Sequence, residues 1–183
     1  MSSTARRTFL FKTVGWREGA VLVGVAWLVP FLVHLLPWGG ARPLGVYVLP
    51  VFWTTFLTVY FYGALPGLAI GLVAPLVNIA LTGLPALRMA GNMGMEVAIF
   101  AAVAALLAGR WPAFWFAAPL AWVAAKALVI AVQFLVPAFE YAGQPLQHLL
   151  RSTQNGLAGL GVLAVINVLL VVFYPQGDEW ERE

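Results

Sequence analysis

Charged residues are too rare along this chain to cover a surface that faces water. They make up 9% of the 183 residues, whereas hydrophobic residues make up 62%, and the mean hydropathy is +0.91. Soluble domains carry roughly 25% charged residues. Lipid is the solvent that suits this composition, so the sequence predicts an all-α integral membrane protein with almost no soluble part.

Proline, glycine and charged residues divide the chain into six apolar stretches. These stretches cover residues 19–36, 44–62, 67–81, 92–108, 113–136 and 153–174. Six transmembrane helices of about 20 residues would use most of the chain. We therefore predict a single six-helix membrane domain over residues 1–183, with an arm at 1–17 and a tail at 175–183. Segments 82–91 and 137–152 are predicted to be loops.

The distribution of lysine and arginine predicts the orientation of the chain. With the N-terminus inside, three basic residues fall in outer loops, Arg42, Arg88 and Arg151. The cytoplasmic segments then hold six, namely Arg6, Arg7, Lys12, Arg17, Arg110 and Arg182. Cytoplasmic loops of membrane proteins carry the excess of positive charge. Both the N- and C-termini are therefore predicted to be cytoplasmic.

The composition also excludes several kinds of site. The chain has no cysteine, which rules out disulfides and thiolate metal sites. Its two histidines, His34 and His148, lie far apart, so we expect no metal and no other cofactor. No Gly-x-x-x-x-Gly-Lys-Ser/Thr motif is present to bind ATP. Topology explains the net charge of +3 better than nucleic-acid binding does.

Two ionisable residues lie inside predicted spans, where burial of charge is costly. Glu96 falls about 7 Å below the outer end of stretch 92–108, and Lys126 about 15 Å below the outer end of stretch 113–136. The long lysine side chain can reach upward, so we expect the two to meet in the outer half of the membrane. Such a pair either locks two helices together or belongs to a ligand site.

Further polar residues gather at the same predicted depth and favour the ligand site. Asn92 shares a helical face with Glu96, and Gln133 shares one with Lys126. The full set of predicted substrate-binding residues is Asn78, Arg88, Asn92, Glu96, Lys126, Gln133, Gln154 and Asn155. Asn167 lies in the inner half of its stretch and is predicted to join helices by hydrogen bonds.

Small residues recur at four-residue spacing in two places. Ala20 and Gly24 do so in the first stretch, and Gly63, Gly67 and Gly71 lead into the third. This spacing lets helix backbones approach closely, so packing inside the bundle is the default interpretation.

Several of these elements occur together in one known family. Leu49-Pro50 is followed by Gly63-Ala-Leu-Pro-Gly67, and then by segments 71–75 and 81–85. Met93-Gly-Met-Glu96 comes next, and Glu96 stands eleven residues after Pro85. Residues 49–107 thereby resemble the substrate-binding S components of energy-coupling factor (ECF) vitamin transporters. In that family a glycine-spaced third helix leads to a Gly-x-Pro loop, and the fourth helix carries a glutamate about ten residues after the proline.

The resemblance implies a multi-pass protein of the bacterial inner membrane that captures a vitamin or related micronutrient. An ECF transmembrane coupling subunit and two ATPase subunits would be its partners, with Ala20 and Gly24 docking onto the coupling subunit. The ligand would lie between the outer halves of helices four to six, under a cap formed by residues 83–91. Without cysteine the chain lacks the cobalt ligand of some B12-specific S components, although cobalamin held without a thiolate stays open.

Two other functions fit the sequence. One is an intramembrane enzyme with Glu96 and Lys126 as acid and base. The other is an assembly subunit of a membrane complex that binds no ligand. The resemblance favours a transport subunit that is not itself an enzyme.

Overall fold

The computed structural model describes residues 14–40, 44–82, 87–135 and 145–175, and every regular element within these ranges is a helix. The helices are α1 (Trp16–Leu35), α2 (Leu44–Val48), α3 (Pro50–Tyr62), α4 (Ala64–Thr82), α5 (Leu87–Arg110), α6 (Ala117–Leu135) and α7 (Pro145–Phe173). The predicted all-α class is confirmed for this part of the chain.

Four of these helices are long and apolar enough to cross a membrane, namely α1, α5, α6 and α7. The apolar part of α4, Ala64–Val77, is shorter, and α3 has only 13 residues. The chain is therefore a helical protein compatible with several membrane crossings. The count of six crossings stays a prediction.

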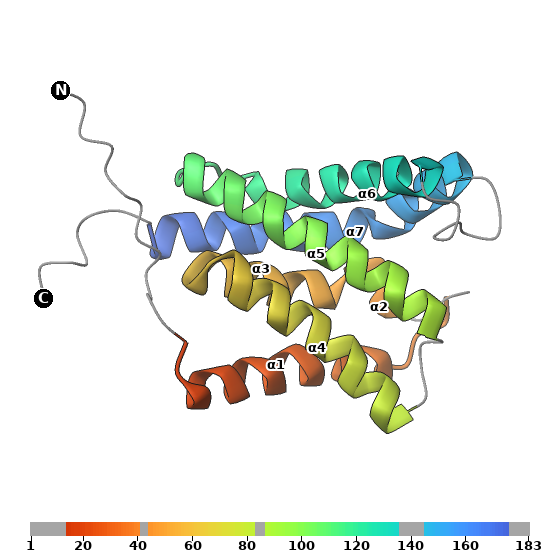
Figure 1. The fold of residues 1–183 in the computed structure, drawn as a ribbon, viewed down its shortest axis with the longest axis horizontal. Helices are drawn as coiled ribbons and strands as arrows, with labels where there is room; N and C mark the ends of the chain where they lie inside the picture. Colours follow the sequence, from red (N-terminus) through yellow and green to blue (C-terminus); the bar gives the residue numbers. More distant parts are fainter. Residues whose placement is uncertain (1–13, 41–43, 83–86, 136–144, 176–183) are drawn as a thin grey trace, which may run out of the picture.

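The helices run back and forth along one long axis of the molecule (Figure 1). The first turn of α1 and the last turn of α7 lie at the same end of the bundle (Figure 1). The termini themselves lie outside the described residues, so their predicted cytoplasmic location stays a prediction. Helix α1 lies at one edge, against α3 and α4, while α5, α6 and α7 pack together at the other.

The predicted second helix, 44–62, is interrupted at Leu49. This residue adopts a left-handed conformation, with φ 56° and ψ 46°, between α2 and α3. Pro50 has no N–H group to continue the helix and disfavours right-handed helix at the residue before it. The Leu49 side chain packs against α7, where a Cβ atom at Gly159 would collide with it. The single continuous helix was therefore a wrong prediction.

Helix α3 forms the centre of the core, with nine of its 13 residues buried. Its aromatic side chains meet those of neighbouring helices edge to face. The Phe52 ring lies 5.1 Å from the Phe100 ring of α5 and 6.4 Å from the Trp122 ring of α6. Such pairs contribute about 0.5–1.5 kcal/mol each beyond the area that they bury.

Glycines let α4 approach this core closely. A Cβ atom at Gly67 would collide with Val59 of α3, and one at Gly71 would collide with Thr55 of α3 and Val97 of α5. The predicted packing role of these two glycines is confirmed. Gly63 ends α3 with φ 92°, a conformation that favours glycine.

Three predicted boundaries were wrong because helices extend past the apolar stretches. Helix α5 already begins at Leu87, α7 at Pro145 and α4 at Ala64, so parts of the predicted loops and turns are helical. Proline is tolerated in the first turn of a helix, where its missing N–H would have no partner. Polar residues continue a helix readily where it leaves the apolar part of the bundle.

Candidate functional site

Glu96 and Lys126 form an ion pair inside the bundle. The Lys126 Nζ atom donates to both carboxylate oxygens of Glu96, at 2.7 and 2.6 Å. The two residues are 8% and 9% exposed, because α5 and α6 pack closely against each other. The predicted meeting of these two residues is confirmed.

The two residues lie at equal depths along their helices. Glu96 stands nine residues after the start of α5 and Lys126 nine residues before the end of α6. At 1.5 Å per residue, each is about 13 Å from the same end of the bundle. The predicted depth of about 7 Å for Glu96 was wrong, because α5 begins five residues before residue 92.

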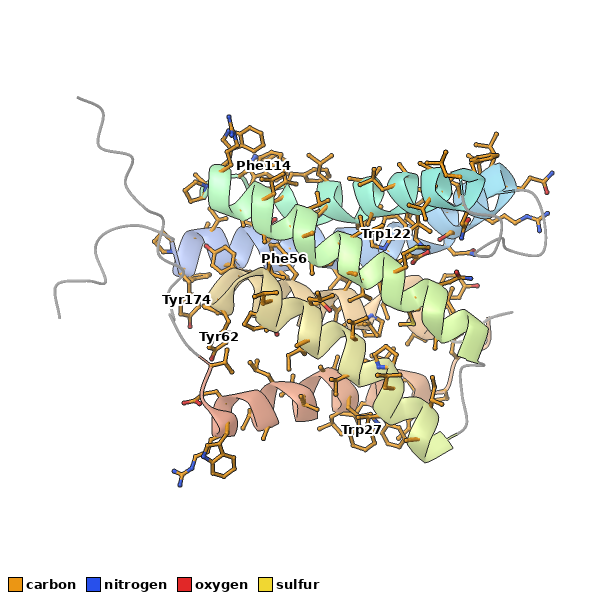
Figure 2. All side chains as sticks on the ribbon, in the orientation of Figure 1. Trp27, Phe56, Tyr62, Phe114, Trp122 and Tyr174 are labelled. Carbon is orange, nitrogen blue, oxygen red and sulfur yellow. The ribbon has the colours of Figure 1, made fainter. Side chains whose placement is uncertain are left out.

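Trp122 completes the surroundings of the pair. It lies one turn before Lys126 on the same face of α6, and the Nζ atom is 5.3 Å from the centre of its ring. A desolvated ammonium group over an indole gains up to about 2 kcal/mol. Trp122 is only 1% exposed, and Figure 2 shows its side chain inside the bundle. Trp122 is not among the predicted site residues, although the sequence places it four residues before Lys126.

Gln133 is buried without a hydrogen-bond partner. It lies two turns beyond Lys126 on the buried face of α6 and is 3% exposed. Neither its Oε1 nor its Nε2 atom has a partner in the described structure, and the Nε1 atom of Trp122 has none there either. A buried polar group without a partner costs about 1–3 kcal/mol. The buried face of α6 therefore carries hydrogen-bonding groups that the bundle itself does not use.

Asn92 belongs to the same interior region. It lies one turn before Glu96 on α5 and is 4% exposed. Asn155 is half-buried on α7, whereas the neighbouring Gln154 is exposed. The buried part of the predicted site is thus formed by Asn92, Glu96, Lys126 and Gln133, and Gln154 lies outside it.

The remaining predicted site residues are only partly described. Asn78 lies in α4 and Arg88 in the first turn of α5, and their side chains fall outside the described structure. Of the predicted cap at 83–91, residues 83–86 lie outside the described ranges and residues 87–91 are helical. Gly91 therefore lies inside α5, and the predicted cap is not a loop over residues 87–91.

Asn167 has a structural role, as predicted. Its Oδ1 atom accepts a hydrogen bond from the Ala118 N–H at 2.7 Å, and its Nδ2 atom donates to the Phe114 carbonyl at 3.2 Å. It is 1% exposed. The side chain from α7 thereby caps the first turn of α6, which would otherwise have unpaired N–H groups.

A separate apolar groove lies between α4 and α5. It has a volume of about 380 Å³ and is lined by Leu72, Pro75, Leu76, Ala90, Gly91 and Gly94. None of these side chains is polar, so the groove offers no hydrogen bonds from side chains. It is lined by a different face of α5 from the one that carries Asn92 and Glu96.

The small-residue pair of α1 does not pack inside the bundle. Ala20 and Gly24 are both exposed, and a Cβ atom at Gly24 would meet nothing within 4 Å. Apolar side chains on the same helix are also exposed, including Val21, Val25 and Leu28. The default interpretation of this pair as internal packing was therefore wrong.

Comparisons with known protein families, with characterised proteins and with solved structures found no match to this chain. Within the described residues, no three His, Cys, Asp or Glu side chains gather where they could hold a metal ion. The described residues thus form a helical protein compatible with several membrane crossings, with a buried ion pair and a buried amide that has no hydrogen-bond partner among them.

Proposed function

We propose that this protein is the substrate-binding S component of an ECF-type importer in the bacterial inner membrane. It captures a vitamin or related micronutrient from outside the cell, with cobalamin among the candidates. A transmembrane coupling subunit and two ATPase subunits supply the energy for release. Both termini lie in the cytoplasm, and the chain crosses the membrane six times.

The buried polar region of α5 and α6 is the observation that carries this proposal. A bundle that only had to fold in lipid would gain nothing from a buried glutamine without a partner, because each such group is costly there. Asn92, Glu96, Lys126 and Gln133 follow one another along two packed helices. The amide of Gln133 and the indole N–H of Trp122 have no hydrogen-bond partner in the described structure, and a bound solute would supply one.

The exposed pair on α1 supports the partner assignment. Ala20 and Gly24 leave a low surface on which another helix can approach closely. This surface is on the helix at the edge of the bundle, whereas the buried polar region lies between α5 and α6. Docking and solute binding would therefore use separate parts of the molecule.

The two functions can be separated by experiment. We expect Ala20→Leu and Gly24→Leu to abolish uptake in cells that supply the coupling and ATPase subunits, because a bulky side chain blocks close helix approach. The purified variants should still contain the small molecule found by mass spectrometry in the wild-type protein. Gly161→Leu on the exposed face of α7, where a Cβ atom also meets nothing within 4 Å, is the matched control.

Two results would contradict the proposal. Loss of the small molecule together with uptake would show that the α1 residues act on the fold rather than on a partner. A wild-type protein that contains no small molecule and supports no uptake would favour an assembly subunit.

A further inference from the structure

Gln133 indicates which kind of solute the site recognises. The side chain is 3% exposed, and neither polar atom has a hydrogen-bond partner in the described structure. A leucine would fill a similar volume at this position without any unpaired group. An amide without a partner is unfavourable in a buried position, and a ligand that pairs with it would remove that penalty.

The charges at the site indicate a ligand without net charge. Both carboxylate oxygens of Glu96 are already bonded to Lys126, so the pair is neutral as a unit. A charged ligand beside the pair would lose its hydration and would gain no counter-charge from the pair. This loss is costly in a buried site. A neutral ligand avoids this cost and leaves the ion pair intact.

An amide side chain both donates and accepts a hydrogen bond. Its complement is an edge that carries an acceptor and a donor side by side, as in a carboxamide, a lactam or a cyclic urea. Gln133 lies two residues before the end of α6, and Lys126 lies about 10 Å deeper along the helix axis. A ligand that enters from this end therefore reaches the amide before the ion pair.

We propose that Gln133 is the recognition residue for a neutral ligand with an amide-type edge, bound at the buried face of α6 two turns from Lys126. This inference rests on the proposed function and gives the substrate class of that same site. Asn92, one turn from Glu96 on α5, is a further buried amide.

The first test measures thermal unfolding of the purified protein in detergent. Gln133→Leu removes the unpaired amide, so we expect the melting temperature to rise by about 2–4 °C or more. Phe134→Leu is the matched control, because its side chain is 67% exposed on the neighbouring position of α6, and it should leave the melting temperature nearly unchanged. A lower melting temperature for Gln133→Leu would overturn the inference, because it would mean that the amide stabilises the fold.

The second test uses nicotinamide and nicotinate at millimolar concentration as probes. They share one ring and differ in carrying a neutral carboxamide or a carboxylate. We expect nicotinamide to raise the melting temperature of the wild type and of Phe134→Leu, nicotinate to raise neither, and Gln133→Leu to respond to neither probe. A wild type that does not respond to nicotinamide, or that responds equally to nicotinate, would overturn the inference. A nicotinamide response that survives in Gln133→Leu would do the same.

Failure of this inference can be told apart from failure of the proposed function. A charged micronutrient that co-purifies and is taken up with the coupling subunit would overturn the neutral ligand class and leave the transport function standing. A Gln133-dependent nicotinamide response without any uptake would support the recognition residue and contradict the transport function.

Discussion

The Glu96–Lys126 pair allows a quantitative prediction about stability. Glu96→Leu leaves the ammonium group of Lys126 buried without its counter-charge, and Lys126→Leu does the same to the carboxylate. Removal of one partner of a buried ion pair costs about 3–5 kcal/mol. For a chain of this size, this corresponds to a fall in melting temperature of about 6–20 °C.

The two single variants should not be equal. In Glu96→Leu the ammonium group keeps its contact with the Trp122 ring, 5.3 Å away, which offsets about 0.5–2 kcal/mol. Among the described residues, no comparable contact is available to the carboxylate of Glu96 in Lys126→Leu. We therefore expect Lys126→Leu to be the more destabilising of the two.

The double variant Glu96→Leu/Lys126→Leu should recover most of the loss. Replacement of a buried ion pair by apolar residues is often neutral, or stabilising by about 1–4 kcal/mol. A double-mutant cycle, measured by thermal or denaturant unfolding in detergent, gives the coupling free energy between the two residues. Glu18→Gln on the exposed first turn of α1 is the control for loss of a carboxylate and should change stability little.

Two results would refute this reasoning. Single variants that each cost less than about 1 kcal/mol would behave like an exposed ion pair and would mean that the two charges are well solvated. Costs that simply add in the double variant would mean that the two side chains do not interact.

Three further predictions concern packing and topology. Asn167→Leu should cost about 1–3 kcal/mol in unfolding experiments, because the first turn of α6 loses its buried partner. Gly71→Ala should lower the free energy of unfolding by about 1–3 kcal/mol through overpacking against α3 and α5. Gly161→Ala has open space around the new methyl group, so it should be neutral or raise the free energy of unfolding by up to about 1 kcal/mol. A single cysteine at Gly143 should react with a membrane-impermeant reagent from outside the cell, and one at Gly177 only from inside. Labelling of both from one side would contradict the six-span topology.

The sequence predicted the helices and the ion pair well, for physical reasons. Long apolar runs are stable in lipid only as helices, so α1, α5, α6 and α7 follow from composition and length. Glu96 and Lys126 are opposite charges in neighbouring apolar stretches, and each would be costly alone. Their meeting therefore followed from the sequence without knowledge of the packing angles.

Other features could not be read from hydropathy. The N-terminal ends of α5 and α7 extend into polar segments. Helix formation in these segments depends on local backbone hydrogen bonds and not on contact with lipid. The break at Leu49 was signalled by Pro50, but an apolar run on both sides hid it. The exposure of Gln154 depends on how α7 is rotated about its axis against its neighbours. Side chains at adjacent positions of a helix point in directions about 100° apart, so Gln154 can be exposed although Asn155 is half-buried.

Asn167 and Gln133 are two of the three buried amides among the described residues, and their hydrogen bonding differs. Asn167 is 1% exposed, and both of its side-chain polar atoms are bonded to the backbone before and within α6. Gln133 is 3% exposed, lies near the opposite end of the same helix, and has both atoms unpartnered in the described structure. The fold therefore satisfies a buried amide where the amide supports the architecture. The amide of Gln133 makes no such bond in the described structure, and this difference between the two ends of α6 is the observation on which the proposed ligand contact rests.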